Sequence, residues 1–189
     1  MRKLKLQVQV SIDGFMAGPN GEMDWMEWNW DAALNQYITE LTDSADTIVL
    51  GRKLADGFID YWENMANNPE TASEGRAIND MAKVVFSRNL DTVRWENTTL
   101  ANKDFIGEIN TLKSSDGRDI IAYGGSEFVS SLIKADLIDE YYLLVNPTAI
   151  GKGLTVFGEL DAVRQLKLVE ARQFLCGITL MQYNKINKQ

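Results

Sequence analysis

The sequence contains no histidine and a single cysteine. Without histidine, catalysis by a Ser–His–Asp triad or a Cys–His pair is excluded, and the commonest ligand of metal sites is missing, so we expect no metal site. Cys176 has no second cysteine with which to form a disulfide. Its apolar neighbours Leu175 and Ile178 favour a buried, inert thiol over a nucleophile.

Long apolar runs and an excess of positive charge are also missing. No stretch of about 18 apolar residues is present, and residues 1–5 are not followed by the apolar segment of a secretory signal. We therefore expect a cytoplasmic protein that does not enter a membrane. The 27 acidic residues outnumber the 19 basic ones, which gives a formal net charge of −8. This balance argues against a nucleic-acid partner, which needs a basic surface.

The length of 189 residues and the hydrophobic fraction of 45% are typical of one globular domain, which we expect over residues 1–189. Alternating apolar and polar residues predict a half-buried strand at 3–11. Further strands are predicted at 47–50, 83–87, 120–123, 141–145, 166–171 and 177–186. Helices are predicted at 25–43, 52–62, 104–112, 126–134 and before Met81, and a loop at 64–75. The pattern predicts an α/β fold with a mainly parallel sheet, helices on both faces and an antiparallel C-terminal edge.

Two apolar segments end in glycine immediately before a predicted helix. Gly51 is followed by Arg52, Lys53 and Leu54, and Gly124-Gly125 are followed by Ser126 and Glu127. Unsatisfied N–H groups and the dipole at a helix N-terminus favour an anion. Glycine also lets a phosphate approach the backbone. Both segments are therefore candidate phosphate sites, and an ordinary tight turn is the alternative for each.

A third apolar segment ends in Ser87 and Arg88. Ligands of open α/β sheets bind beyond the carboxyl ends of the strands, so the three segments together predict a dinucleotide site. Arginine can hold a phosphate through two N–H groups. We therefore expect Arg52 and Arg88 to bind a 2′-phosphate, with a solvated surface arginine as the alternative.

A glycine-rich loop at 13–21 follows the first predicted strand. It is a candidate for a mobile lid over a reactive ring, or else an ordinary long loop. Asp13 within it is expected to shape the loop. Trp28 and Trp30 lie beyond it and are candidates for stacking on a flat heterocycle, although core packing is an equally good interpretation.

Taken together, these segments resemble the dihydrofolate-reductase-like superfamily. The nearer resemblance is to the branch of the riboflavin-biosynthesis reductase domain, the C-terminal domain of a bifunctional deaminase–reductase, and to its stand-alone members. The matching residues occur in the family's order over about 3–186. They are Ser11–Gly14, Gly18, Trp25, Leu50–Lys53, Lys83–Arg88, Leu90, Gly124-Gly125, Leu137–Tyr141, Pro147, Gly151–Gly153 and Phe157.

The resemblance implies a three-layer fold with a central sheet of about eight strands, a homodimer, and NADPH as the hydride donor. The small-molecule substrate would be a heterocycle, carbonyl or imine, as in the 5-amino-6-(5-phosphoribosylamino)uracil reductases or the dihydrofolate reductases. The cofactor would contact Ala17, Gly51, Arg52, Lys53, Leu54, Ser87, Arg88, Tyr123, Gly124, Gly125, Ser126 and Glu127.

The substrate end of the site is less well defined by the sequence. Leu54 stands where the family often has threonine, so one hydroxyl for a cofactor phosphate is lost. Phe15 stands where the riboflavin-pathway enzymes usually have lysine, so the substrate is left open. We expect Trp25, Trp30 and Thr155 to contact it and Asp31 to be the catalytic proton donor. An exposed aspartate at a helix start is the alternative for Asp31, and a bound water the alternative donor. A nucleotide-binding protein without catalysis and a flavin-dependent enzyme also remain open.

Overall fold

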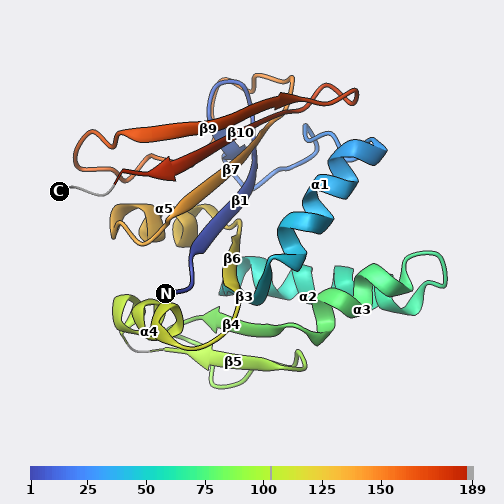
Figure 1. The fold of residues 1–189 in the computed structure, drawn as a ribbon, viewed down its shortest axis with the longest axis vertical. Coiled ribbons are helices and arrows are strands. Elements are labelled where there is room, and N and C mark those ends of the chain that lie inside the picture. The colour runs from blue at the N-terminus through green and yellow to red at the C-terminus, as the bar shows by residue number, and fades with distance from the viewer. Residues whose placement is uncertain (103, 187–189) are drawn as a thin grey trace.

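The computed structural model describes residues 1–102 and 104–186. Its centre is an eight-stranded sheet in the order β5-β4-β3-β6-β1-β7-β10-β9 (Figure 1). The strands from β5 to β7 run parallel, β10 pairs antiparallel with β7, and β9 pairs antiparallel with β10. The predicted α/β fold with an antiparallel C-terminal edge is therefore confirmed.

The strands of this sheet are β1 Leu4–Val10, β3 Ala45–Gly51, β4 Ala82–Phe86, β5 Thr98–Ala101, β6 Asp119–Tyr123, β7 Glu140–Val145, β9 Leu166–Gln173 and β10 Thr179–Lys185. The helices are α1 Ala32–Asp43, α2 Arg52–Asn67, α3 Ala72–Asp80, α4 Phe105–Ser114 and α5 Ser126–Lys134. Two short strands, β2 Phe15–Ala17 and β8 Leu154–Thr155, form a separate antiparallel pair.

Helices cover both faces of the sheet, as expected. On one face the even-numbered residues of β1 pack with α4 and α5, and on the other face β3 and β6 pack with α1, α2 and α3. The strand at 3–11 is not half-buried as predicted, because it lies at the centre of the sheet. Lys5 and Gln7, which alternate with the apolar residues of β1, are only 7% and 8% exposed.

Two helical segments differ from the predictions. The helix expected at 25–43 begins only at Ala32. Asp31 is its N-cap residue and accepts a hydrogen bond from the backbone N–H of Leu34. The loop expected at 64–75 consists largely of the end of α2 and the start of α3, which extend from the sheet (Figure 1). Gly75 lies inside α3, where a Cβ atom would overlap the backbone of Ala66. This glycine permits close helix packing and does not mark a loop.

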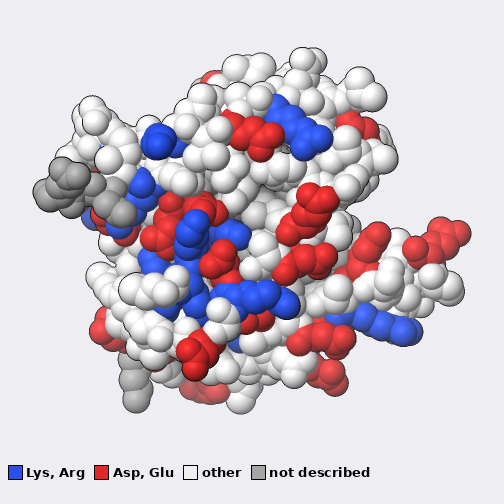
Figure 2. Space-filling view, in the orientation of Figure 1, with Lys and Arg blue, Asp and Glu red and all other residues white. Residues whose placement is uncertain are grey.

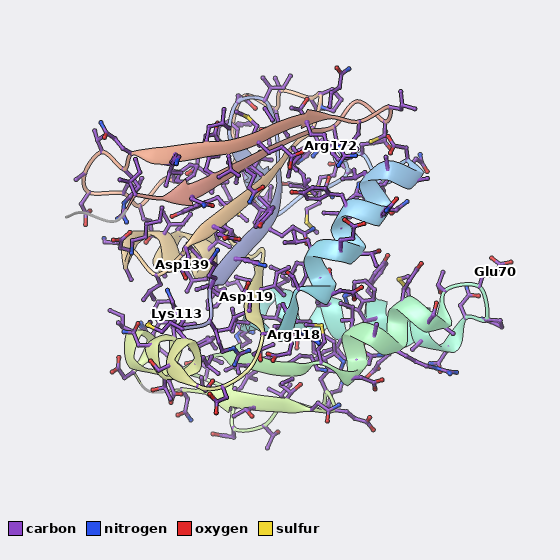
Figure 3. All side chains as sticks on the ribbon, viewed as in Figure 1. Glu70, Lys113, Arg118, Asp119, Asp139 and Arg172 are labelled. Carbon is purple, nitrogen blue, oxygen red and sulfur yellow. The ribbon has the colours of Figure 1, made fainter. Side chains whose placement is uncertain are left out.

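Ion pairs gather at the amino edge of the parallel strands, where Figure 2 shows basic and acidic side chains interleaved. Lys5 Nζ lies 2.9 Å from Asp119 Oδ2, and Lys113 Nζ lies 2.6 Å from Asp139 Oδ2 (Figure 3). Arg2, which is also buried, pairs with Asp46. The buried bases of this edge are therefore neutralised by carboxylates within the protein.

No helix in residues 1–102 and 104–186 is both long enough and apolar enough to span a bilayer.

Candidate functional site

Two helix N-termini lie side by side at the carboxyl edge of the sheet. Gly51 caps α2 at the end of β3, and Gly125 caps α5 after β6, the neighbouring strand. A Cβ atom on Gly125 would lie 3.6 Å from the Cβ of Leu54, and Lys53 Nζ lies 2.6 Å from Glu127 Oε1. Neither cap makes a side-chain hydrogen bond to its helix. The N–H groups of both first turns are therefore suited to an anionic ligand.

Both cap positions require glycine, for different reasons. At Gly51 a Cβ atom would come within 2.7 Å of the Cβ of Phe128 on α5, which is closer than side chains pack. At Gly125 the backbone has φ of +91°, in a region that favours glycine. Close packing at Gly51 and the backbone conformation of Gly125 thus allow the starts of α2 and α5 to lie next to each other.

The third strand end predicted for the site lies next to the first. Gly51 is in register with Phe86, so the turn at Ser87 and Arg88 follows β4 beside the start of α2. Ser87 Oγ accepts hydrogen bonds from the backbone N–H groups of Asn89 and Leu90, both at 3.1 Å. The hydroxyl therefore shapes this turn, and Arg88 is exposed beside it.

Arg52 and Arg88 differ from the bases of the amino edge. In residues 1–102 and 104–186, neither guanidinium lies within 4.0 Å of a carboxylate. Lys53, in contrast, is paired with Glu127. In a protein of net charge −8, two arginines without an acidic partner at one edge provide local charge for an anion.

Of two further residues expected at the cofactor, Ala17 belongs to the β2 segment beside the Gly124-Gly125 turn, whereas the side chain of Tyr123 lies in the core. The ε-carbon of Met16 in β2 lies 3.6 Å from the Cβ position of Gly124, so the β2 segment, with the buried Ala17, borders the glycine turn. The Tyr123 side chain packs inside, with its ring centroid 5.2 Å from that of Phe58 and a raised pKa of about 12 because of burial. Only the backbone of Tyr123 faces the edge.

Asp13 shapes the glycine-rich loop, as expected. Its carboxylate accepts hydrogen bonds from Ser11 Oγ at 2.6 Å, from the N–H of Ile150 at 3.2 Å and from the N–H of Gly151 at 2.7 Å. The Ser11 hydrogen bond, followed by that of Gly151, lowers its pKa. The amino half of the loop is thus tied to the segment after β7. The lid hypothesis is thereby confined to the exposed residues 19–24.

Asp31 serves as a cap and a tether. Oδ1 accepts a hydrogen bond from the N–H of Leu34 at 2.9 Å, and Oδ2 accepts one from the N–H of Cys176 at 3.0 Å, in the β9–β10 turn. These backbone bonds lower the pKa of Asp31, whereas a general acid needs a raised one. Thr155, which was expected at the substrate, lies in β8 and pairs with Phe15 of β2, and it makes no hydrogen bond with Asp31 among the described residues. The geometry supports the helix-start alternative, and the catalytic role of Asp31 stays a prediction.

The tryptophans belong to a non-helical segment that Asn146 holds in place. Trp30 Nε1 donates to the carbonyl of Glu27 at 2.8 Å, and its ring stacks on that of Trp28, which is 61% exposed. The N–H of Glu27 donates to Oδ1 of the fully buried Asn146 at 2.7 Å. Trp25 Nε1 donates to the carbonyl of Glu22. The sequence analysis missed Asn146, although an asparagine directly after an apolar strand and before Pro147 is a visible signal.

Residues 2–180 match the RibD C-terminal domain family. The chain belongs to this family. In residues 1–102 and 104–186, no three side chains of His, Cys, Asp and Glu come together as a metal site would require. The candidate site in the described residues therefore consists of the glycine turns and the arginines of the carboxyl edge.

Two Bacillus subtilis (strain 168) proteins are similar in sequence to this RibD C-terminal domain family member. YyaP, an uncharacterized protein, is 30% identical over 184 residues, which cover 97% of this chain and 95% of YyaP. YwjB, also uncharacterized, is 28% identical over 173 residues, which cover 92% of each chain. Both similarities run over nearly the whole chain.

Solved structures confirm the dihydrofolate-reductase-like fold. A Shewanella sp. PV-4 protein assigned to riboflavin biosynthesis superposes with a TM-score of 0.74 at 21% identity, over 99% of this chain and 100% of that one. The Thermotoga maritima diaminohydroxyphosphoribosylaminopyrimidine deaminase/5-amino-6-(5-phosphoribosylamino)uracil reductase superposes with a TM-score of 0.68 at 16% identity. This match covers 98% of the present chain and 57% of the Thermotoga chain. At these identities the similarity establishes the fold.

Proposed function

We propose that the protein is an NADPH-dependent reductase that transfers a hydride to a small heterocyclic, carbonyl or imine substrate. The observation that carries the proposal is the meeting of two glycine-capped helix N-termini with the Ser87-Arg88 turn at one sheet edge. One dinucleotide has phosphates enough to engage all three. Membership of the RibD C-terminal domain family supports a reductase of the riboflavin-pathway type.

The residues present fit this cofactor. Gly51 and Gly125 leave backbone N–H groups free of side-chain caps, and Arg52 and Arg88 have no acidic partner within the described residues. We assign the diphosphate to the two helix starts and the 2′-phosphate to the arginines. Bound there, NADPH would supply the hydride.

The remaining tasks of the chain are orientation and proton supply. The tryptophan segment, fixed through Glu27 and Asn146, would form a wall that orients the substrate and excludes water. Asp31 has a lowered pKa and is therefore ionised at neutral pH. We accordingly propose a bound water as the proton source.

NADPH should bind more tightly than NADH, and Arg88→Ala should remove most of the difference. A hydrogen bond to a charged group contributes roughly 1.5–3 kcal/mol, so we expect NADPH affinity to fall by about 10- to 100-fold while NADH affinity stays unchanged. Titration followed by the fluorescence of the five tryptophans measures both constants. Arg76→Ala, at an exposed position of α3, is the matched control. Equal affinity of the wild-type protein for the two cofactors would contradict the 2′-phosphate assignment.

Asp31→Asn separates tethering from proton donation. If the carboxylate only caps and tethers, turnover is retained and the urea midpoint falls at neutral pH, because the amide has one acceptor oxygen in place of two. Since the folded pKa lies below the ordinary 3.8, the stabilisation is present above that value and is lost as the pH falls through the folded pKa. Urea unfolding across this range measures it. A loss of turnover of roughly a hundredfold or more would show instead that Asp31 is the general acid.

The two alternative functions, a flavin-dependent enzyme and a nucleotide-binding protein without catalysis, predict different experimental results. A flavin absorbance band in the purified protein would favour a flavin-dependent enzyme. NADPH binding without oxidation against pterins, ribosylaminouracil phosphates and small carbonyls would favour a nucleotide-binding protein that lacks catalysis. We also propose a homodimer, which sedimentation of the full chain tests.

A further inference from the structure

The side-chain amide of Asn146 has an orientation that the backbone dictates. Oδ1 lies 2.7 Å from the backbone nitrogen of Glu27, and Nδ2 lies 3.2 Å from the carbonyl oxygen of Leu144. A backbone N–H can only donate a hydrogen bond, and a backbone carbonyl can only accept one. The amide of Asn146 therefore has its oxygen toward Glu27 and its NH₂ group toward Leu144. Asn146 is fully buried, so a reversed amide would leave the N–H of Glu27 without its acceptor and would place an oxygen against the carbonyl of Leu144.

This orientation determines that of Gln9. Nδ2 of Asn146 also lies 3.0 Å from the side-chain amide of Gln9, to which it must donate. Gln9 therefore presents Oε1 to Asn146 and turns its own NH₂ group away. That NH₂ group has no hydrogen-bond partner among residues 1–102 and 104–186, whereas the Asn146 amide is satisfied on both sides. Gln9 is half-buried, so a donor is held in place near the end of β1.

The position of this donor relates it to the rest of the site. Gln7 is in register with Tyr123, so Gln9, two residues further along β1, is level with the Gly124-Gly125 turn on the neighbouring strand. Through Asn146 and Glu27, Gln9 is also connected to the segment that carries Trp30. A chain of hydrogen bonds thus joins the strand beside the glycine turn to the tryptophan segment.

We propose that the carboxamide NH₂ of Gln9 donates a hydrogen bond to an acceptor atom of the substrate, and that Asn146 is the positioning residue that orients it. Among the heterocyclic substrates of the proposed function, this donor selects those with a ring carbonyl or ring nitrogen as acceptor. This inference rests on the proposed function, because it assigns the substrate end of the same site. Gln9 is then a specificity-determining residue that acts independently of cofactor binding.

Gln9→Glu tests the polarity of this contact with little change of shape. The glutamate still accepts from Asn146 Nδ2, while its second oxygen replaces the donor with an acceptor. The probes are lumazine, which has two ring carbonyls, and 2,4-diaminopteridine, which has amino groups in their place. With NADPH bound, the wild-type protein should prefer lumazine. The ratio of the two dissociation constants should shift toward the diamino compound by about tenfold or more in Gln9→Glu, as expected for one exchanged hydrogen bond.

Asn146→Asp tests the positioning role by the same ratio. The substitution replaces the Nδ2 donor with a carboxylate oxygen. The Gln9 amide is then expected to rotate and donate to this carboxylate, which turns its own oxygen toward the substrate. The ratio should therefore shift in the same direction, a change that a loss of packing alone would not produce. Gln165→Glu, exposed at the opposite edge of the sheet, is the matched control and should leave the ratio unchanged.

The titrations separate this inference from the proposed function. An unchanged ratio in Gln9→Glu, with NADPH affinity intact, overturns the assignment of Gln9. Failure of both probes to bind the wild-type complex with NADPH overturns it as well. Failure of the wild-type protein to bind NADPH, measured before either probe is added, contradicts the proposed function itself.

Discussion

Gly51→Ala is expected to weaken NADPH binding by roughly 10- to 100-fold, because each hydrogen bond from the helix start to a charged phosphate contributes about 1.5–3 kcal/mol. The new methyl group would lie 2.7 Å from the Cβ of Phe128. That Cβ atom is attached to the backbone of α5 and cannot rotate away. Relief of the overlap therefore moves the starts of α2 and α5 apart, and the N–H groups of both lose their common ligand. Fluorescence titration with NADPH measures the loss.

Gly57→Ala is the matched control for this variant. Gly57 lies at an exposed position inside the same helix, and apart from its chain neighbours and the backbone of its own helix no described atom lies within 4 Å of its Cβ position. NADPH affinity should be unchanged, and the free energy of unfolding should rise by roughly 0.5–1 kcal/mol, because alanine is the better helix former. If Gly51→Ala bound NADPH as tightly as the wild-type protein, the two helix starts would not be the diphosphate site.

Lys83→Met is expected to lower the free energy of unfolding by about 1–3 kcal/mol, the cost of a buried carbonyl left without a donor. The loss falls mainly on the carbonyl of Met81, because that of Asn79 also accepts from Asn97 Nδ2 at 3.3 Å. Lys83 lies in β4 and is 1% exposed. Its Nζ donates to the carbonyl of Asn79 at 2.6 Å and that of Met81 at 2.7 Å, and lies 4.6 Å from the ring centroid of Trp95. Methionine has a similar shape but cannot donate. Because methionine is uncharged, the variant no longer has the cost of burying the Lys83 ammonium group, and this offsets part of the lost stability. Urea unfolding measures the difference.

The pH dependence of the free energy of unfolding tests whether the Lys83 ammonium group causes the difference between Lys83→Met and the wild-type protein. Burial lowers the pKa of Lys83 from 10.5 to about 8. Between these values the unfolded chain binds more protons than the folded one, so the wild-type protein should gain stability as the pH rises from about 8. Lys83→Met should lack this gain. Lys167→Met, at an exposed position of β9, should stay within about 0.5 kcal/mol of the wild-type protein. A Lys83→Met protein as stable as the wild type would show that the carbonyls find other donors.

The fold was largely predictable because its central strands carry continuous apolar segments. Among the segments that were not predicted correctly, two have a structure that does not follow from the apolar and polar pattern of their own residues. Residues 98–101 form the edge strand β5, in which two threonines precede the apolar pair and give little signal. Residues 25–31 have the composition of a helix start, but the N–H of Glu27 is bound to Asn146, 119 residues away in the sequence.

The cofactor end of the candidate site was predictable for a related reason. Carboxyl ends of neighbouring parallel strands share one edge, so correct prediction of the strands at Gly51, Ser87 and Gly124 brings these residues together. The substrate end depends instead on contacts such as that of Gln9 with Asn146, which are 137 residues apart in the sequence. Side-chain hydrogen bonds of this kind leave no periodic signal. The role expected for Asp31 rested on the family resemblance, in which an acid follows the loop tryptophan matched by Trp25, and not on a contact.

The central position of β1 has a consequence for the order in which the protein folds. Strand β1, which is synthesised before the other strands of this sheet, lies between β6 and β7, and the N–H of Lys3 binds Asp119, 116 residues later. Its pairing must therefore wait until β6 and then β7 have been synthesised, whereas β3 and β4 pair across the shorter connection that contains α2 and α3. Such a high contact order favours slow folding. During synthesis, β1 has neither of its neighbouring strands until β6 and β7 emerge, and its apolar residues are then prone to aggregation.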